Sequence, residues 1–344
     1  APVADALTEA GNLLARATLV HSYPHSWRSK APLIFRTTPQ WFISMDTNGL
    51  REKALKAISK TDFYPSSGRN RLEGMVGNRP DWCVSRQRAW GSPITVFVHK
   101  ETGEPLRDQA VIDRIADAVE EEGHDCWFSS PPSRFLGNDH DPNDYEQVTD
   151  ILDVWFDSGS THSFVLEKRE DLKWPADLYL EGSDQHRGWF HLSLLESCGT
   201  RGRAPYDGVL THGFVMAEEG VKMSKSTGNV VAPQAVIKQY GADILRIWVV
   251  ASDYSEDLKI GPDILKHQAD AYRRLRNTLR YLLGNLDGFD ETERVSVEDM
   301  PELEQFVLHR VAELDTMVRQ CCETYDFHTL FTQLHNFCAV ELSS

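Results

Sequence analysis

The sequence has no pair of cysteines spaced as C-x-x-C, although it contains six cysteines in 344 residues. This pattern indicates neither a disulfide framework nor a closed zinc site, and it is typical of reduced thiols in a cytoplasmic protein. The chain also lacks an apolar run long enough to span a bilayer, and the acidic segment 1–14 does not have the pattern of a signal peptide. We therefore expect a cytoplasmic protein without a membrane partner.

Positive charge is also scarce, since 36 Lys and Arg stand against 52 Asp and Glu and leave a net charge of −16. RNA binding would therefore need a local basic patch. One candidate runs from Arg69 to Arg88, where arginines accompany Trp82 and then Trp90. This composition suits phosphates and unstacked bases, but it also suits a core edge tied by ion pairs, and both interpretations stay open.

No internal repeat or low-complexity tract is present, and the periodicity predicts mixed α/β structure that ends in helices. The predicted helices cover 5–18, 50–58, 108–122, 185–197 and 233–240. The predicted strands cover 34–37, 41–43, 93–98, 177–180 and 209–215, with a mobile surface loop over 129–147. Residues 242–251 are either helix or strand, and three helices follow, a long one from about residue 265 and then 302–322 and 327–342.

A small polar loop with two lysines follows the turn Glu218–Gly220, which is expected to fold the chain back as a hairpin. Two lysines can lie along a triphosphate and follow its charge as it moves to the leaving group. Two lysines alone are more typical of a solvated basic loop, but the neighbouring segments favour the phosphate-binding interpretation. The loop consists of Lys222, Met223, Ser224, Lys225 and Ser226.

A strand, a tight glycine turn and a helix follow one another at residues 177–197, which is the geometry that places ligands at the carboxyl end of a parallel strand. Gly182 allows the backbone to come close to a ligand. The polar side chains of this turn can bind ribose hydroxyls, an ammonium group or a phosphate, and they are Glu181, Asp184, Gln185 and His186. From this segment alone, a helix start capped by Ser183 or Asp184 is the favoured alternative.

The stretch 155–163 (WFDSGSTHS) combines aromatic and polar residues. Trp155 and Trp189 are expected to form the walls of a small apolar pocket. Without further context, packing in the core explains both tryptophans equally well.

Several segments together resemble the bacterial isoleucyl-tRNA synthetases, which are class I aminoacyl-tRNA synthetases, over roughly residues 21–341. The combination of WFDSGS with EGSDQHRGWF distinguishes the isoleucine enzymes from their valine and leucine relatives, whereas KMSKS indicates class I only. In chain order, the segments are GRNRLEGMVGNRPDWCVSRQRAWG, ITVFVHK, DVWFDSGSTHS, YLEGSDQHRGWF, VLTHGF, KMSKSTGN, GADILR and YDFH.

The resemblance implies an α/β fold: the second half of a Rossmann-like nucleotide-binding fold with an insert, followed by an α-helical bundle. The end of the editing insertion and the return to the core would cover 1–45, and a connective insert with a core segment 46–150. The second half of the catalytic domain would cover 151–262, and the start of the anticodon-binding domain 263–344. The family's H-x-G-H motif does not occur in this sequence, and most of the editing insertion is absent too. We therefore expect a truncated chain that is inactive by itself.

The activity implied by the resemblance is that of an isoleucine–tRNA ligase in protein biosynthesis, which uses ATP with Mg²⁺. The carboxylate of isoleucine attacks the α-phosphate of ATP, pyrophosphate leaves, and the acyl group passes to tRNA(Ile). We expect a monomer whose partners are isoleucine, ATP and tRNA(Ile). The alternatives are a sister enzyme for valine or leucine and a non-catalytic RNA-binding paralogue.

The resemblance also implies roles for single residues. Glu181 matches the acidic contact to the adenylate, and Lys225 with its partner Lys222 matches the catalytic lysines that contact ATP. The amino-acid pocket would be lined by Trp155, Gln185 and Trp189. The full set expected to bind ATP or the adenylate is Glu181, Gly182, Asp184, Gln185, His186, Lys222, Met223, Ser224, Lys225 and Ser226.

A possible metal pair of some relatives, C-W-R-C, corresponds to residues 26–29 of this chain. Here Ser26 and Ser29 occupy both cysteine positions. We therefore expect no zinc at this place.

Overall fold

The computed structural model describes residues 2–26, 29–224 and 227–343. The chain divides into two compact units, residues 1–40 and 41–344. The first unit contains helix α1 (Pro2–Glu9) and an isolated antiparallel bridge between His25 and Pro32, and its other described residues form no helix or strand. The prediction of a helix over 5–18 is therefore wrong beyond Glu9, and the prediction of a strand over 34–37 is wrong. Leu14, Leu19 and Ile34 are all exposed, so no core stabilises these segments.

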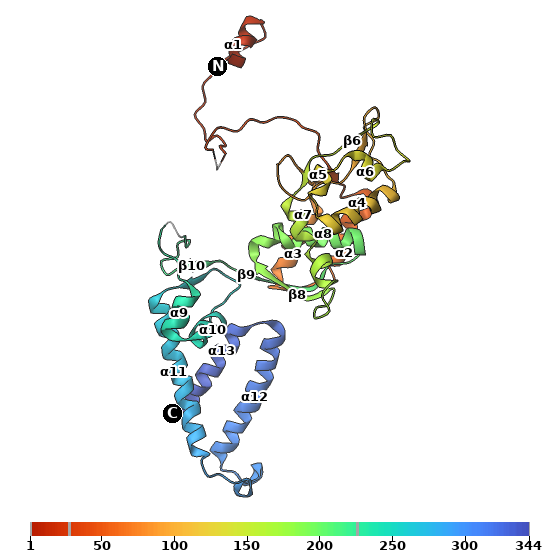
Figure 1. Ribbon diagram of the computed structural model, residues 1–344. Coiled ribbons are helices and arrows are strands. Elements are labelled where there is room, and N and C mark those ends of the chain that lie inside the picture. Colours follow the sequence, from red (N-terminus) through yellow and green to blue (C-terminus); the bar gives the residue numbers. More distant parts are fainter. Residues whose placement is uncertain (1, 27–28, 225–226, 344) are drawn as a thin grey trace. The chain divides into compact units, whose positions relative to one another are not determined.

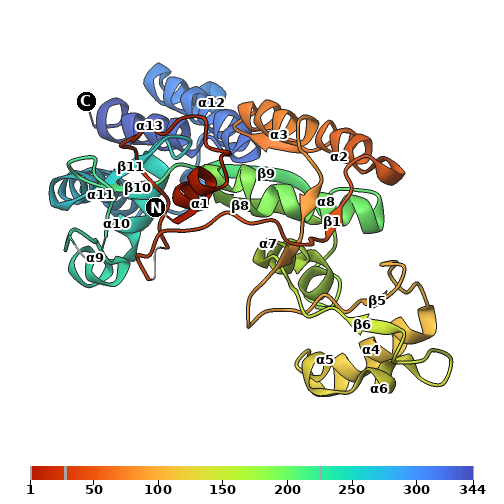
Figure 2. The ribbon, with the colours of Figure 1, turned by 90° about the horizontal axis from the view of Figure 1, so that it is seen from above.

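The centre of the second unit is a three-stranded parallel sheet in the order β2-β9-β8. Its strands are β2 (Asp62–Tyr64), β8 (Ala176–Gly182) and β9 (Tyr206–His212). Helices α2 (Leu50–Ile58), α3 (Ser67–Gly77) and α8 (Trp189–Arg201) accompany the sheet, as Figure 2 shows. The core therefore joins segments that are far apart in the sequence.

Helix α8 forms the middle of this core, because every residue from 190 to 198 is buried. The hydroxyl of Tyr206 on β9 donates to the carbonyl oxygen of Phe190 at 3.0 Å and ties the helix to the sheet. The helix begins at Trp189 rather than at the predicted Gln185, because residues Ser183–Arg187 form a 3-10 turn, η3.

Residues 97–147 form a module with a hydrophobic core of its own. Helix α4 (Gln109–Glu122) begins and ends as predicted, with Asp108 as the N-cap that accepts from Ala110 N. The prediction of a mobile loop over 129–147 is wrong, since Phe135 and Leu136 are fully buried. The other elements are β5 (Phe97–His99), α5 (Cys126–Ser129), α6 (Pro132–Leu136) and β6 (Tyr145–Gln147), which pairs with β5.

Arg114 on α4 holds α6 in place, because its Nε and Nη2 donate to the carbonyl oxygens of Phe135 (2.6 Å) and Leu136 (3.0 Å). Each such bond contributes about 1 kcal/mol. We expect Arg114→Met to raise hydrogen exchange at the α6 amides about tenfold or more, as measured by mass spectrometry. The exposed Arg107→Met is the matched control. Equal exchange in both variants would contradict this account.

Short strands connect this module to the central core. Strand β1 (Phe42–Ile43) pairs antiparallel with β3 (Trp82–Cys83), and β4 (Ser85–Arg86) pairs antiparallel with β7 (Ile151–Leu152). Helix α7 (Val154–Gly159) and a π-helical turn, η2 (His162–Leu166), follow, while the 3-10 turn η1 (Thr47–Gly49) precedes α2.

The arginines of the segment 69–88 divide into two groups. Arg69 donates to the carbonyl oxygens of three residues at the end of α2, at 2.8–3.3 Å. Arg86 forms an ion pair with the buried Asp153 at 2.8 Å. These two arginines therefore tie the edge of the core, as one of the two interpretations expected, whereas Arg71 and Arg88 are exposed.

A smaller body with a hydrophobic core of its own begins after β9, within the second unit. Strand β10 (Val215–Ala217) pairs parallel with β11 (Leu258–Ile260), and α9 (Pro233–Tyr240) starts at the predicted proline. Residues 242–251 form a helix, α10 (Ala242–Ala251). The core of this body contains Val236, Ile244, Trp248, Leu258, Ile260 and Leu265.

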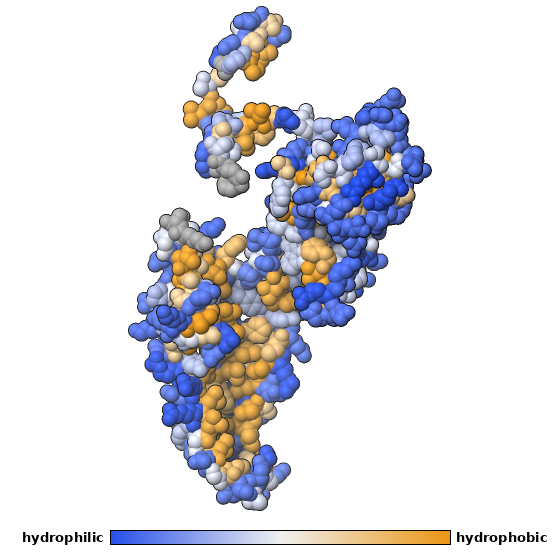
Figure 3. Space-filling view, viewed as in Figure 1, coloured by the Kyte–Doolittle hydropathy of each residue, from blue (hydrophilic) through white to orange (hydrophobic). Residues whose placement is uncertain are grey.

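Three helices follow in blue in Figure 1: α11 (Pro262–Asn285), α12 (Glu302–Thr324) and α13 (Phe327–Asn336). Two 3-10 turns, η4 (Glu291–Glu293) and η5 (Val297–Asp299), lie between α11 and α12, and a π-helical turn, η6 (Phe337–Glu341), follows α13. Figure 3 shows apolar side chains over these helices. The exposed large apolar residues of α11 and α12 include Leu283 and Leu303. None of the helices in the described part of the chain is long and apolar enough to cross a membrane.

Candidate active site

The carboxyl ends of the three parallel strands lie at one edge of the sheet. The register pairs Tyr64 of β2 with Leu210 of β9, and Gly182 of β8 with His212 of β9. The turns that follow β2, β8 and β9 therefore leave the sheet side by side. This edge is where open parallel sheets bind ligands, and it contains the predicted turn 181–186.

Gly182 is buried where the backbone passes close to two polar side chains. A Cβ atom at this position would lie 2.7 Å from Asp184 Oδ1 and 3.9 Å from His212 Cε1. The side chains of Glu181 and Asp184 are exposed, and Asp184 accepts from Gln185 Nε2 at 2.9 Å. Two carboxylates therefore stand at the edge of the sheet, where they can accept from hydroxyl or ammonium groups.

His186 is buried beneath this turn rather than exposed. Its Nδ1 donates to the carbonyl oxygen of Ser183 at 2.8 Å, and its ring packs edge-on against Phe190. A Cβ atom on Gly68 would lie 2.8 Å from His186 Nε2, so α3 also closes over the ring. Burial lowers the pKa of the ring, and nearby Arg71 acts in the same direction. The ring thus supports the turn, and its contact with a phosphate stays a prediction.

The structure brings Trp155, Gln185 and Gly188 together. A Cβ atom on Gly188 would lie 2.4 Å from Gln185 Oε1 and 2.9 Å from the Trp155 ring. Gln185 Oε1 accepts from the backbone N–H of Trp189 at 3.1 Å, so the cap of α8 comes from Gln185. Neither Ser183 nor Asp184, the caps considered from the sequence, caps η3 or α8.

The two tryptophans differ in their surroundings. Trp155 is 40% exposed. The ring of Trp189 stacks on Tyr179 with centroids 4.1 Å apart, and its Nε1 donates to the carbonyl oxygen of Ser158 at 3.0 Å. Trp155 is therefore the one of the pair with a large exposed surface, and the role of both in an amino-acid pocket stays a prediction.

The lysine loop begins in the predicted hairpin. Met216 pairs with Lys222 in an antiparallel bridge, and Gly220 N donates to the carbonyl oxygen of Ala217 at 2.8 Å. Gly220 has a φ of +78°, which favours glycine at this turn. In the described part of the chain, the exposed Lys222 ammonium group has no hydrogen bond or ion pair.

Asn229 closes the base of the lysine loop. Its Oδ1 accepts from Ser224 N at 2.9 Å and from Thr227 Oγ1 at 2.6 Å, while its Nδ2 donates to the carbonyl oxygen of Lys222 at 3.2 Å. Met223 packs against the core around α9–α11. Lys225 and Ser226 lie outside the described residues, so their expected roles stay predictions.

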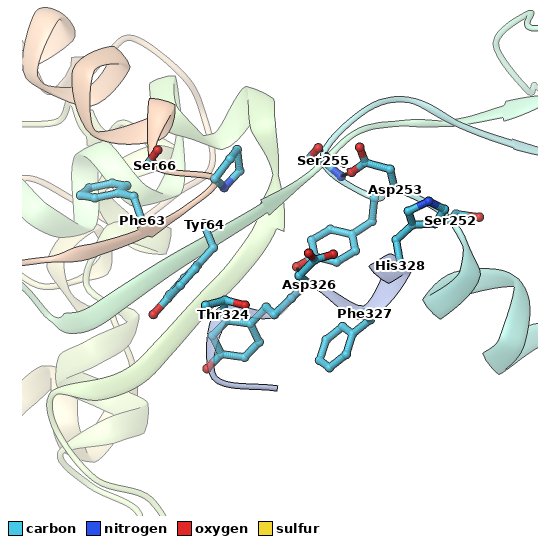
Figure 4. Close-up of a pocket in the computed structure, with 13 residues that line it drawn as sticks. Phe63, Tyr64, Ser66, Ser252, Asp253, Ser255, Thr324, Asp326, Phe327 and His328 are labelled. Carbon is cyan, nitrogen blue, oxygen red and sulfur yellow. Dashed lines mark hydrogen bonds between the residues drawn. The ribbon is translucent and has the colours of Figure 1, made fainter. Parts of the chain in front are cut away.

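A cavity of about 430 Å³ opens beside the end of β2 (Figure 4). Tyr64 and Ser66 lie on one side of it, and the junction of α12 and α13 with Asp326 lies on the other. The rings of Tyr64 and Tyr325 meet edge to face with centroids 4.8 Å apart. None of the predicted site residues in the described ranges lines this cavity.

Two residues, His212 and Glu196, were not predicted from the sequence. His212 ends β9 beside Gly182, and a histidine at the end of the second strand was the available signal. Glu196 lies inside the buried run of α8, where burial, with a further effect of Asp157, raises its pKa to about 9. A lone acid in a helical segment rich in aromatic residues and leucine was the signal for this group.

Candidate metal ligands were sought among the residues that the structure describes. Within the described ranges, no three His, Cys, Asp or Glu side chains are grouped so that they could hold a metal ion. The expectation that the serines at 26 and 29 exclude zinc stays a prediction.

Comparison with known families identifies relatives along the whole chain. Residues 12–261 match the sequence model described as tRNA synthetases class I (I, L, M and V). Isoleucine–tRNA ligase of Pelagibacter ubique is 61% identical over 345 aligned residues, covering 99% of this chain and 38% of that protein. The corresponding ligase of Caulobacter vibrioides is 59% identical and covers 99% of this chain and 36% of that protein. The chain thus spans little more than a third of the length of these curated relatives.

Solved structures with a similar fold are much more distant in sequence. Methionyl-tRNA synthetase of Mycobacterium tuberculosis in complex with methionyl-adenylate matches with a TM-score of 0.60 and 18% identity, covering 92% of this chain and 54% of that one. A ternary LeuRS–tRNA–LeuAMS complex from Agrobacterium radiobacter K84 matches with a TM-score of 0.54, 18% identity and 75% coverage of this chain, against 36% of that one. At this level of identity the likeness shows the fold alone.

Proposed function

The chain belongs to the class I tRNA synthetases of the I, L, M and V group, and from this membership we propose that it is part of an isoleucine–tRNA ligase. The observation that carries the proposal is the identity with isoleucine–tRNA ligases along almost the whole chain. The reaction joins isoleucine to the α-phosphate of ATP and then passes the isoleucyl group to tRNA(Ile).

In this proposal the edge of the sheet holds the adenylate. Glu181 and Asp184 accept hydrogen bonds from the ammonium group of isoleucine and from the ribose, and the absence of a side chain at Gly182 lets the ligand approach the backbone. Trp155 provides an apolar wall for the amino-acid side chain, with Gln185 beside it and Trp189 behind the turn. Their arrangement around Gly188 supports this assignment.

The lysines act on the phosphates. Lys222 and Lys225 balance the negative charge that moves from the α-phosphate to the leaving pyrophosphate. ATP would enter the site as its Mg²⁺ complex. The attacking carboxylate belongs to the substrate, so the site needs positioning and charge rather than a covalent nucleophile. Asn229 fixes the base of the loop and so helps to place Lys222 for this role.

The remaining parts of the proposal follow from the same assignment. The protein works in the cytoplasm as a monomer with tRNA(Ile), isoleucine and ATP as partners, and it holds no zinc. Met223, Ser224, Ser226 and His186 complete the ATP-binding set.

Gly188→Ala is expected to weaken binding of a non-hydrolysable isoleucyl-adenylate analogue about tenfold. The added Cβ would collide with Gln185 Oε1 and the Trp155 ring and displace both. Isothermal titration calorimetry measures the affinity. Gly199→Ala within α8, the helix that Gly188 precedes, is the matched control, because its Cβ would meet its nearest neighbour at an ordinary 3.7 Å. Unchanged affinity in Gly188→Ala would remove this turn from the amino-acid pocket.

The proposed specificity is tested by ATP–pyrophosphate exchange on the full-length protein that contains this chain. Isoleucine is expected to support faster exchange than valine and leucine at equal concentration. Faster exchange with valine or leucine would assign a sister specificity. Absence of exchange together with retained RNA binding would indicate a non-catalytic paralogue, and either result would overturn the proposal.

A further inference from the structure

A second polar cavity, here called the arginine cavity, lies between α3 and the start of α8. It has a volume of about 450 Å³, and its charged or ionisable lining residues are Arg71, Arg79, Arg187 and His191. No acidic residue is among those that line it. The lining of this cavity is therefore positively charged, although the whole chain has a net charge of −16.

Two arginines of the cavity, Arg71 and Arg187, are exposed. In the described part of the chain, the guanidinium groups of Arg71 and Arg187 form no hydrogen bond or ion pair. Arg69 and Arg86 from the same arginine-rich segment use their guanidinium groups on backbone carbonyls and on Asp153. The two arginines of the cavity are thus available to a ligand.

Arg79 lies deeper in the cavity. Its guanidinium carbon is 5.7 Å from the centre of the Trp82 ring, and its Nε is buried without a hydrogen-bond partner. Burial lowers the pKa of Arg79, and the charge of Asp153 opposes this effect. The remaining N–H groups keep a positive charge at the cavity wall.

His191 provides the second, independent observation. The residue is only 2% exposed, and in the described structure neither ring nitrogen has a hydrogen-bond partner. Burial, followed by Arg79 and Arg187, lowers the pKa of His191 to about 3, so the ring is neutral near pH 7. A neutral ring still carries one N–H donor. Buried polar groups are rarely left unpaired, so a bound ligand would provide the missing hydrogen-bond partner of the His191 ring.

We propose that the arginine cavity binds a phosphate group, with Arg71, Arg79 and Arg187 as charged donors and His191 as a neutral donor. Guanidinium groups match the oxygens of a phosphate and form charge-assisted hydrogen bonds with them. The volume of about 450 Å³ leaves room beside a phosphate for a sugar or a base. The phosphate belongs either to an RNA backbone or to a free inorganic anion. This proposal goes beyond the proposed ligase activity, because none of the residues assigned above to ATP lines the cavity.

Calorimetric titration of the 344-residue chain with three probes tests the proposal: inorganic phosphate, pyrophosphate, and a single-stranded RNA oligonucleotide without a terminal phosphate. Arg71→Ala and Arg187→Ala are expected to weaken binding about tenfold or more. The exposed Arg88→Ala is the matched control and is expected to leave affinity unchanged, because Arg88 does not line the cavity. If Arg71→Ala and Arg187→Ala weaken binding of the RNA alone, the phosphate belongs to an RNA backbone. If they weaken binding of inorganic phosphate or pyrophosphate, it is a free anion.

The ring signals of His191 provide a second readout that needs no substitution. Nitrogen-15 NMR of the unaltered chain is expected to show these signals shifting on addition of the binding probe. Equal affinity of all variants, equal loss in Arg88→Ala, or unshifted His191 signals would overturn the proposal. Exchange activity with isoleucine does not enter this experiment, so its outcome is independent of the ligase assignment.

Discussion

Replacing Lys222 by alanine is expected to lower isoleucine-dependent ATP–pyrophosphate exchange of the full-length protein about 10²- to 10³-fold. The reason is that a positive charge aimed at developing negative charge stabilises the transition state more than the bound substrates. The structure leaves the Lys222 ammonium group exposed. The chain itself is held through the Lys222 carbonyl oxygen, which accepts from Asn229. The substitution therefore removes the charge and leaves the anchoring of the loop in place.

The matched control for this experiment is Lys238→Ala. Lys238 is an exposed lysine on α9 in the same body, and its loss changes the overall charge by the same amount. Exchange is expected to stay within about twofold of the unaltered protein in this control. A rate in Lys222→Ala equal to that in Lys238→Ala would exclude a role of Lys222 in catalysis.

The unaltered chain is expected to lose stability as the pH rises above 6.5, and Glu196→Gln is expected to abolish this loss. Burial first, and Asp157 second, raise the pKa of Glu196 from 4.5 to about 9. The unfolded chain ionises this group at its ordinary pKa, whereas the folded chain keeps it protonated. The stabilisation is therefore fully present below pH 4.5 and is lost by about 1.4 kcal/mol per pH unit as the pH rises toward 9.

His191 changes the shape of this profile, because its shift has the opposite sign. Burial and two arginines lower its pKa from 6.5 to about 3, so its stabilisation is present above pH 6.5 and is lost as the pH falls toward 3. Between pH 4.5 and 6.5 the two slopes cancel. The combined contribution of Glu196 and His191 is thus flat over this interval and falls on both sides.

Urea denaturation of the chain and of Glu196→Gln at several pH values measures the effect. The difference in free energy of unfolding between the two should change with pH in favour of Glu196→Gln, reaching several kcal/mol at pH 8 by the slope of about 1.4 kcal/mol per unit. Glu121→Gln on the exposed face of α4 is the matched control. A difference that is constant from pH 5 to pH 9 would show that Glu196 is ionised in the folded chain.

Elements with a local signal at both ends could be predicted from the sequence. Helix α4 has Asp108 as its cap and Gly123 at its end, and α9 starts at Pro233. The hairpin that leads into the lysine loop was predictable from its turn, Glu218–Gly220. At 129–147 the only sequence signal was a series of turn-forming residues, which predicted a loop. The structure instead has the helix α6 there, and Phe135 of this helix is buried in the core.

The candidate site was predictable in position but less so in its contacts. The order of strand, glycine and helix places the turn after Gly182 at the carboxyl edge of the sheet. The burial of His186 depends on Gly68 in α3, which is distant in sequence. The arginine cavity likewise joins α3 with the start of α8. Only the packing of these elements reveals which arginines are paired and which are available.

The most direct test of the central claim is calorimetric binding of non-hydrolysable isoleucyl-, valyl- and leucyl-adenylate analogues to the 344-residue chain. The account predicts tightest binding of the isoleucyl analogue, with the valyl form weaker by about 0.8 kcal/mol, or roughly fourfold, for its missing methylene group. It also predicts that this preference is reduced in Gly188→Ala. Equal affinity for the three analogues, or no binding of any of them, would contradict an isoleucine-selective site at the edge of this sheet.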